Sequence, residues 1–257
     1  MTGCQMPCGG GNGGSSGSPA PTGPPGALDP SFGNHGVVIT PTGGDTYTDA
    51  VLVQANGMIV VAGYDQATGT FGSINRVTTQ IARFAADGAP HTGFGQGGQT
   101  TVSELDVPGR YAPIALALQT DGTMLLDVPG GSTRLLPNGA VDTTYGIGGT
   151  AAGVGGYLAL QPNGKLVTAQ TALIGDSRTT FALSRYASDG AVDTSFGGGG
   201  DSVIALRTDS VAGGVAIQPD GRIVVAGYES PDQVSDSGAG SVVVARYFGD
   251  RASSAQP

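Results

Sequence analysis

The chain has 257 residues, of which 47 are glycine and 16 are proline, a composition typical of a chain rich in turns. Its 39% hydrophobic content can still support a core. Its 20 acidic residues outnumber its 11 basic ones, giving a formal net charge of −9, and no basic cluster exists, so binding of nucleic acid is disfavoured. No stretch has the apolar periodicity of an amphipathic helix, and no run of about 18 apolar residues occurs. The sequence therefore predicts an all-β chain without a transmembrane helix.

The first 26 residues are a low-complexity run of glycine, serine and proline that cannot build a core, so residues 1–26 are expected to form a disordered tether. The opening Met1-Thr2-Gly3-Cys4 resembles the end of a bacterial lipobox, which would place a lipid on Cys4. The charged and apolar regions of a signal peptide are missing, so an incidental pair of Cys4 and Cys8 in a disordered tail is the alternative. No cysteine follows Cys8, and therefore no disulfide or cysteine-ligated metal can hold the rest of the chain.

Three short patterns recur in a fixed order along the rest of the chain. The first is a corner that ends in an aromatic residue and a glycine, with its aromatic at Phe32, Phe94, Tyr145 and Phe196. The second is a hairpin of apolar strands that reverses at Asn56-Gly57, Asp121-Gly122, Asn163-Gly164 and Asp220-Gly221. The third is a short strand that carries an arginine near its end, at Arg83, Arg134, Arg185 and Arg246. An internal period of about 50 to 60 residues indicates a propeller or a repeat array.

Each pattern has a local physical cause. The Asn-Gly and Asp-Gly dipeptides supply the positive φ that tight hairpin turns require. The corner carries an aspartate that can accept hydrogen bonds from nearby backbone N–H groups, and an aromatic ring that can fill the space between units. A short strand such as 36–40 or 202–206 follows the corner. Each unit therefore supplies four strands, which is the content of one propeller blade.

The order of the patterns favours a closed ring over an open array. The fourth unit lacks a corner and a following strand, whereas residues 27–40 supply a corner and a strand without a hairpin. In a ring, residues 27–40 would complete the blade formed by residues 215–247, and no bare sheet edge would remain. We therefore predict an all-β, four-bladed β-propeller-like domain over residues 27–248, closed by pairing of its N- and C-terminal segments, with an open β-repeat array as the alternative. Residues 249–257 are expected to form a disordered tail.

Four of the repeated segments carry a resemblance to a known family. They are LDPSFG at 28–33, FALSRYASDG at 181–190, VDTSFG at 192–197 and QPDGRIVVAG at 218–227. Together they resemble the delta-60 repeat family of bacterial proteins, over nearly everything outside the tether. The resemblance implies a propeller-like protein that is exported or displayed at the surface, and it implies no reaction. The second unit departs most from the pattern, because His91 replaces the corner aspartate and Val128-Pro129-Gly130 cuts its hairpin short.

The repeated charges are the nearest feature to a polar site. The corner aspartates Asp29, Asp142 and Asp193 could each pair with an arginine of an adjoining strand. A pair that recurs once per unit indicates a structural lock rather than a catalytic site. The two histidines, His35 and His91, occupy non-equivalent loop positions, so the sequence predicts no metal site and no cofactor. No catalytic residue is predicted, although paired carboxylates for glycan hydrolysis remain the weaker alternative.

Two of the four connections in each unit vary in length, and in an up-and-down blade both lie at the same end. Insertions of this kind mark the functional face of a repeat protein. Aromatic residues on these loops are the ligand-binding candidates: Tyr64, Phe71, Tyr111 and Tyr228. The leading hypothesis is a non-enzymatic binding or adhesion module for an unknown surface ligand, either protein or glycan. The alternatives are a structural envelope component without a ligand and, less favoured, a glycan-active enzyme. We expect a monomer that is secreted, or anchored to the bacterial cell envelope through a lipidated cysteine.

Overall fold

The computed structural model describes residues 23–41, 45–67, 75–107, 115–128, 131–152, 156–174, 178–203, 209–230 and 240–250. Every regular element among these residues is a β-strand, as the composition predicts. Within the same ranges there is no helix with the length and hydropathy needed to cross a membrane. The tether and the tail expected from the sequence fall almost entirely outside the described residues, and Cys4 lies outside them as well.

The strands form four antiparallel sheets, which we call blades 1 to 4. Blade 1 contains β1 (Asp45–Val53), β2 (Ile59–Ala67), β3 (Asn75–Phe84) and β4 (Gln99–Val107). Blade 2 contains β5 (Leu116–Leu118), β6 (Met124–Val128), β7 (Gly131–Leu135) and β8 (Thr150–Ala152). Blade 3 contains β9 (Tyr157–Leu160), β10 (Leu166–Ile174), β11 (Arg178–Tyr186) and β12 (Asp201–Val203). Blade 4 contains β13 (Asp209–Ile217), β14 (Ile223–Ser230) and β15 (Ser241–Tyr247).

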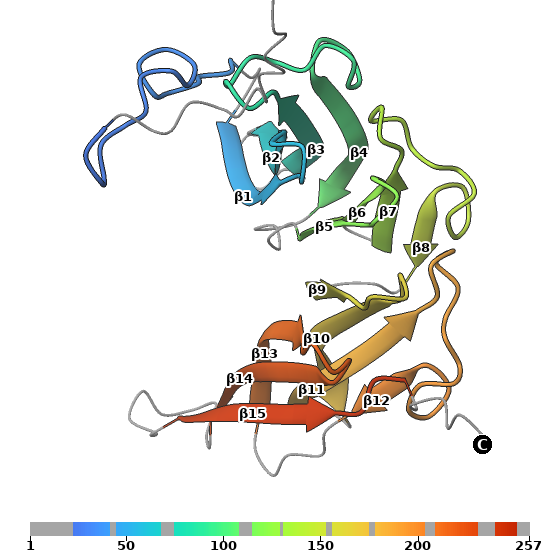
Figure 1. The fold of residues 1–257 in the computed structure, drawn as a ribbon. Helices are drawn as coiled ribbons and strands as arrows, with labels where there is room; N and C mark the ends of the chain where they lie inside the picture. Colours follow the sequence, from blue (N-terminus) through green and yellow to red (C-terminus); the bar gives the residue numbers. More distant parts are fainter. Residues whose placement is uncertain are drawn as a thin grey trace, which may run out of the picture.

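The four blades follow one another around a ring, so the chain folds as a four-bladed β-propeller (Figure 1). The first strand of each blade, β1, β5, β9 or β13, lies on the inner side of the ring, and consecutive inner strands contact one another. The predicted all-β, four-bladed propeller fold is thereby confirmed. Figure 1 also shows that the ring is open between blade 1 and blade 4.

The hairpin turns form where the sequence predicts them, because glycine there adopts the left-handed backbone conformation. Gly57 has φ of 82° and Gly221 has φ of 80°, at the same place in blades 1 and 4. The preceding residue adds a second constraint: the side-chain oxygen of Asn56 accepts a hydrogen bond from the Met58 N–H at 3.1 Å. These turns hold the first two strands of every blade in register and make one end of the propeller uniform.

The hydrophobic core is divided among the interfaces between consecutive blades. Between blades 1 and 2 the buried side chains are Val60, Ala62, Ile81, Phe94, Met124, Leu126 and Leu135. Between blades 2 and 3 they are Leu125, Tyr145, Ala151, Leu166 and Tyr186. Between blades 3 and 4 they are Val167, Ala169, Phe181, Leu183, Phe196, Ala212, Ile223 and Val225. Each blade therefore depends on its neighbours to bury its apolar faces.

Blade 4 is the exception to the four-strand rule. Its sheet ends at β15, and within the described residues there is no ladder between β15 and residues 36–40, so the pairing that we expected to close the ring is not present. Residues 27–40 lie instead on blade 1, where the Gly33 N–H donates to the carbonyl oxygen of Asp87 at 2.7 Å. This seat offers the same kind of backbone acceptor that the corners of blades 1 and 2 find on the next blade, at Asn138 and Asp189.

Candidate functional site

The repeated corner assembles an arginine, a carboxylate and an aromatic ring at one point of each blade. In blade 3 the Asp193 N–H donates to the Arg185 carbonyl oxygen at 2.9 Å, which holds the corner against β11. This backbone bond brings the Asp193 carboxylate within 2.8 Å of the Arg185 Nε. The guanidinium also lies 4.7 Å from the ring centroid of Phe196, a cation–π contact. The Arg185 side chain is almost completely buried.

Blades 1 and 2 repeat this arrangement with one change. In blade 2 the Arg134 Nε donates to the Asp142 carboxylate at 2.8 Å, and its guanidinium lies 4.9 Å from the Tyr145 ring centroid. In blade 1 the histidine that replaces the aspartate takes over as acceptor: the Arg83 Nη2 lies 3.1 Å from the His91 Nδ1. Since arginine can only donate, His91 accepts through a deprotonated Nδ1.

The corner arginines also reach forward to the next blade. Arg83 donates to the carbonyl oxygen of Pro137 at 2.6 Å, and Arg134 donates to that of Ser188 at 2.6 Å. Each guanidinium therefore joins its own corner to the turn of the following blade. The geometry is that of a lock between blades, because each of these guanidinium groups donates to protein acceptors of two blades.

The carboxylate of Asp193 is strongly held in its ionised form. Burial alone would raise the pKa of Asp193, but hydrogen bonds from the Ser195 hydroxyl and from Lys165, together with the Ser195 N–H and the charge of Arg185, lower it well below its usual range. The distances are 2.6 Å from the Ser195 Oγ and 3.0 Å from the Lys165 Nζ. A group ionised this firmly cannot serve as a general acid or base near neutral pH.

The first and the fourth corner residues stand apart from this pattern. Asp29 is exposed and accepts hydrogen bonds from the Ser31 N–H and hydroxyl, which lower the pKa of Asp29. Phe32 is half-buried against blade 1, with no arginine stacked on it among the described residues. Arg246, at the equivalent position of blade 4, is exposed. The sequence therefore supplies four arginines and four aromatics, and the structure joins three of each.

The opposite end of the blades, which we call the irregular end, carries the variable connections and the exposed tyrosines. Tyr47 near the start of β1, Tyr157 at the start of β9 and Tyr228 near the end of β14 are each about half exposed. Tyr47 stacks on Tyr64, with ring centroids 5.0 Å apart and planes at 18°. By contrast, Tyr145, at the uniform end, is buried. Exposed tyrosines are common in binding surfaces because one side chain offers both an apolar face and a hydroxyl.

Of the four aromatic residues proposed from the sequence, the structure places Tyr64 and Tyr228 at the irregular end, while Phe71 and Tyr111 lie outside the described residues. Tyr47 and Tyr157 were not predicted. Tyr47 lies opposite Tyr64 because a bulge between Thr48 and Ala50 shifts the β1–β2 register. No sequence signal places Tyr47 opposite Tyr64, because counting strand residues outward from the Asn56-Gly57 turn does not reveal the bulge.

Carboxylates that are buried or partly buried brace the base of the irregular end. Asp65 on β2 accepts from the Thr46 hydroxyl and the Gln80 amide, each at 2.5 Å. Asp209 at the start of β13 accepts from the Thr179 N–H of blade 3 at 2.6 Å. These contacts fix strand ends both within a blade and between blades. Among the described residues no group of three His, Cys, Asp or Glu side chains is placed to hold a metal ion.

Asp127 is a third carboxylate of this kind, and it has no counterpart in the other blades, which carry Ala62, Ala169 and Ala226 at the aligned position. One carboxylate oxygen accepts from the Gly156 N–H at 2.9 Å, and the other is buried without a hydrogen-bond partner among the described residues. Burial raises the pKa of Asp127 to about 7, against a smaller opposing effect of the Gly156 N–H. Blade 2 therefore contains a carboxyl group that titrates near neutral pH.

This burial predicts a pH-dependent stability. Because the pKa of Asp127 is higher in the folded chain than in the unfolded chain, its stabilising contribution is complete below about pH 4 and is lost as pH rises through about 7. Asp127→Asn keeps an oxygen for the Gly156 N–H and removes the buried charge. We expect the variant to raise the free energy of unfolding by about 2 kcal/mol at pH 8 and by much less at pH 5, as measured by urea denaturation at both pH values. An equal gain at both pH values would contradict this assignment.

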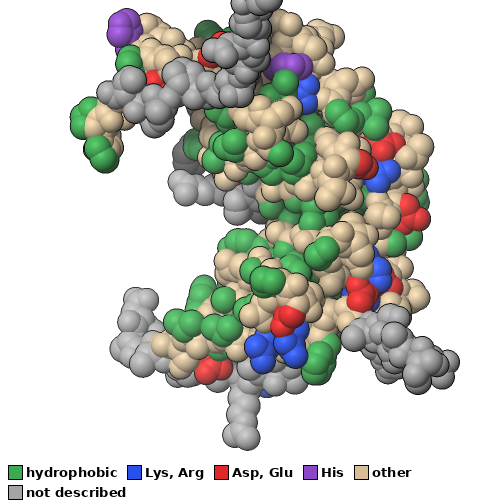
Figure 2. Space-filling view, in the orientation of Figure 1, with side chains coloured by type: hydrophobic (Ala, Val, Ile, Leu, Met, Phe, Trp, Pro, Cys, Tyr) green, Lys and Arg blue, Asp and Glu red, His purple; other side chains and the backbone are tan. Residues whose placement is uncertain are grey.

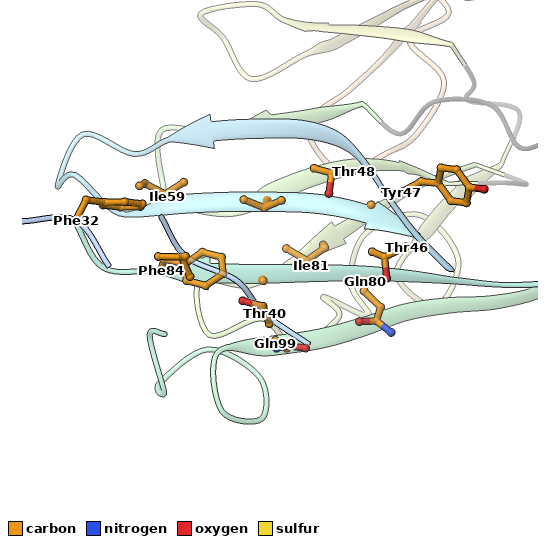
Figure 3. A pocket seen from close by; sticks show the side chains of 14 residues that line it. Phe32, Thr40, Thr46, Tyr47, Thr48, Ile59, Gln80, Ile81, Phe84 and Gln99 are labelled. Carbon is orange, nitrogen blue, oxygen red and sulfur yellow. The ribbon is translucent and has the colours of Figure 1, made fainter. Parts of the chain in front are cut away.

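An apolar cavity of about 360 Å³ lies between the N-terminal segment and blade 1 (Figure 3). Phe32 and Val38 from the N-terminal segment cover one part of it, and Ile59, Val61 and Phe84 of blade 1 form its floor. Its far end is polar, where Thr46 and Gln80 lie. Figure 2 shows hydrophobic side chains on both sides of the opening. The cavity brings together no predicted catalytic pair.

Comparison with known proteins gives a fold and no activity. A family model described as a domain of unknown function (DUF5122) beta-propeller matches residues 161–196 and 218–250, which contain the second and third strands of blades 3 and 4. This match confirms a propeller repeat in these blades, and the narrower identification with the delta-60 repeat family stays a prediction. A solved structure, "Crystal structure of glucose dehydrogenase", matches with a TM-score of 0.35 and 12% identity, over 81% of this chain and 84% of that one. No curated protein matches the chain.

Proposed function

We propose that this chain is a non-enzymatic, exported binding module that engages its ligand through the irregular end of the propeller. The observation that carries the proposal is the distribution of tyrosines: Tyr47, Tyr157 and Tyr228 are exposed at that end, on three different blades. At the same end, strand ends are held by hydrogen bonds to the buried Asp65 and the partly buried Asp209. Exposed aromatic rings on a rigid base form a preorganised surface.

The chemistry of this surface favours a glycan as the ligand. Tyr47, Tyr157 and Tyr228 each expose about half of the side chain, so each ring is accessible at the surface. Each of these tyrosines also carries a hydroxyl beside its apolar ring. A sugar chain offers C–H faces to the rings and hydroxyls to the polar groups. The corner arginines Arg134 and Arg185 are already paired with Asp142 and Asp193 within the protein.

Affinity electrophoresis or calorimetry against a panel of purified bacterial and plant polysaccharides tests the proposal. We expect the Tyr47→Ala, Tyr228→Ala double variant to lose at least about tenfold in affinity for the polysaccharide that the native chain retains, with an unchanged melting temperature. Ile147→Ala is the matched control, since Ile147 is an exposed apolar side chain at the uniform end. Equal binding by all three proteins would overturn the role of the irregular end.

The alternatives predict different outcomes in the same panel. A structural envelope component would bind no polysaccharide. Replacement of residues 231–239 by a short Gly/Ser loop would then leave the binding result unchanged. A glycan-active enzyme would release reducing ends from one of the polysaccharides, and detectable turnover would refute the non-enzymatic proposal.

For export, the Met1-Thr2-Gly3-Cys4 motif supports anchoring through Cys4. Cys4→Ser should then abolish labelling by radioactive palmitate in a bacterial host while Cys8→Ser retains it; labelling that survives Cys4→Ser would exclude this anchor.

A further inference from the structure

Blades 1, 2 and 3 meet through one repeated interface. At the first of these interfaces the Gly95 N–H of the blade 1 corner donates to the Asn138 carbonyl oxygen of blade 2 at 2.8 Å. The Phe94 ring covers Gly139 so closely that a Cβ there would lie 2.9 Å from the ring. The same bond recurs between the next two blades, from Gly146 N–H to the carbonyl oxygen of Asp189, also at 2.8 Å. Each blade thus has an exit face, which carries its corner, and an entry face, which receives the corner of the blade before.

The entry face of blade 1 already holds a corner. Gly33 donates to the Asp87 carbonyl oxygen at 2.7 Å, and Phe32 lies 3.1 Å from where a Cβ on Gly88 would stand, in the same relation as Phe94 to Gly139. The rest of the blade that should come with this corner is absent from the entry face. Val51 and Val53 of β1 are about two-thirds exposed there, whereas the aligned residues of blades 2, 3 and 4 are partly buried. The cavity over Ile59, Val61 and Phe84 is therefore a seat for an exit face.

The exit face of blade 4 has the complementary deficiency. Val242 and Val244 on β15 are 83% and 64% exposed, although the aligned residues of blade 3, Phe181 and Leu183, are both fully buried. The outer edge of β15 pairs with no strand among the described residues. Arg246 is exposed without the aromatic ring that the other three corner arginines contact. Blade 4 thus offers an arginine and an unpaired strand edge. The segment that lies on blade 1 offers the matching parts, which are a corner aromatic, an aspartate and a short strand.

These two faces cannot meet within one chain without changing the rest of the ring. They lie on opposite sides of its opening (Figure 1). The angle between blades is set at three interfaces that are already packed, with Phe94, Tyr145 and Phe181 fully buried. Closing the gap within one chain would require all three interfaces to be repacked, and well-packed cores resist such changes. A second chain could fill the gap with no change to any of them.

We propose that two copies of this chain associate head to tail and close into an eight-bladed ring. The exit face of blade 4 in each copy packs on the entry face of blade 1 in the other, and residues 27–40 supply the fourth strand that β15 lacks. Arg246 then stacks on Phe32 and pairs with Asp29 of the second copy, which completes the fourth lock. The two interfaces are identical and related by a two-fold axis, so the assembly closes and leaves no free face. This proposal replaces the monomer expected from the sequence, and it stands independently of the proposed ligand.

Light scattering coupled to size-exclusion chromatography tests the proposal directly. With reductant present, so that Cys4 and Cys8 cannot cross-link, we expect the full chain to have twice its mass of 25.3 kDa at micromolar concentration. Val244→Asp places a charge at the centre of the interface and should weaken association by at least about tenfold. The residue is exposed within each chain, so circular dichroism and melting temperature of the dissociated variant should remain those of a folded propeller.

A charge exchange tests which faces are in contact. Arg246→Glu and Asp29→Lys should each yield monomers when purified separately, because each disrupts both interfaces of its own ring. In a one-to-one mixture, the altered blade 4 of the first variant faces the altered corner of the second, and the remaining interface is native. We therefore expect the mixture to recover the dimer. Arg222→Glu, an exposed arginine on the same blade, is the matched control and should remain dimeric.

Three results would overturn the proposal. The first is a native chain that remains monomeric at all concentrations, whether or not β15 then pairs with residues 36–40 of its own chain. The second is a dimer that Val244→Asp and Arg246→Glu leave intact, because another surface would then hold it. The third is a mixture of the Arg246→Glu and Asp29→Lys chains that stays monomeric although each is folded. The mass measurement needs no ligand, so it is unaffected by failure of the proposed binding function.

Discussion

Replacing Arg185 with alanine is expected to destabilise the chain by about 3 to 5 kcal/mol, which corresponds to a fall of roughly 10 °C in melting temperature. The side chain is buried, contacts the Phe196 ring and lies 2.8 Å from the Asp193 carboxylate. Removing it leaves that carboxylate with one fewer counter-charge and opens a void under the aromatic ring. Thermal unfolding followed by circular dichroism measures the change.

The control for this prediction is Arg222→Ala. Arg222 forms an ion pair with Asp220 and lies 5.9 Å from the Phe248 ring centroid, so it has the same kinds of partner. Both members of this pair are exposed to water, where such pairs contribute little. We expect no measurable change in melting temperature for Arg222→Ala. Similar losses for the two arginines would show that burial at the corner is not what makes Arg185 important.

Phe181→Ala should have a comparable effect through a different mechanism. The ring is fully buried between blades 3 and 4, and it approaches Gly227 so closely that a Cβ there would lie 2.5 Å from it. Truncation removes this contact and leaves a cavity between two sheets that cannot easily move together. We expect a loss of about 3 to 5 kcal/mol in the free energy of unfolding, measured by urea denaturation.

Leu173→Ala in the same blade provides the comparison for Phe181→Ala. Leu173 is a large apolar side chain of β10 that is mostly exposed, so its removal creates no cavity. The free energy of unfolding should change by less than about 0.5 kcal/mol. If Phe181→Ala proved equally mild, blades 3 and 4 would not share the core described here.

Much of this fold could be predicted because it is encoded locally and four times over. The Asn56-Gly57 type of turn fixes a hairpin without reference to the rest of the chain. The pairing of Asp142 with Arg134 and of Asp193 with Arg185 is likewise local, since the corner loops back onto the strand that carries the arginine. The Val128-Pro129-Gly130 sequence predicts a short hairpin in blade 2, and β6 and β7 are five residues long each.

The parts that could not be predicted depend on contacts between units. Nothing in one repeat indicates that Arg134 reaches the carbonyl of Ser188 in the next, or that Asp127 is buried beside Gly156. The Tyr47–Tyr64 stack depends on a bulge that shifts strand register by one residue. The expected pairing of residues 36–40 with β15 rested on repeat order alone. Repeat order shows which face a segment fits, and it does not show whether that face belongs to the same chain.

The corners of blades 1 and 2 each tie their blade to the next through a backbone hydrogen bond. Amide hydrogen exchange measured by NMR at Gly95 and Gly146 tests this claim most directly, because these N–H groups donate across blade interfaces to Asn138 and Asp189. We predict that both amides exchange as slowly as those in the centre of β2. Rapid exchange at both glycines while the strand amides stay protected would show that the sheets form without being joined in this way.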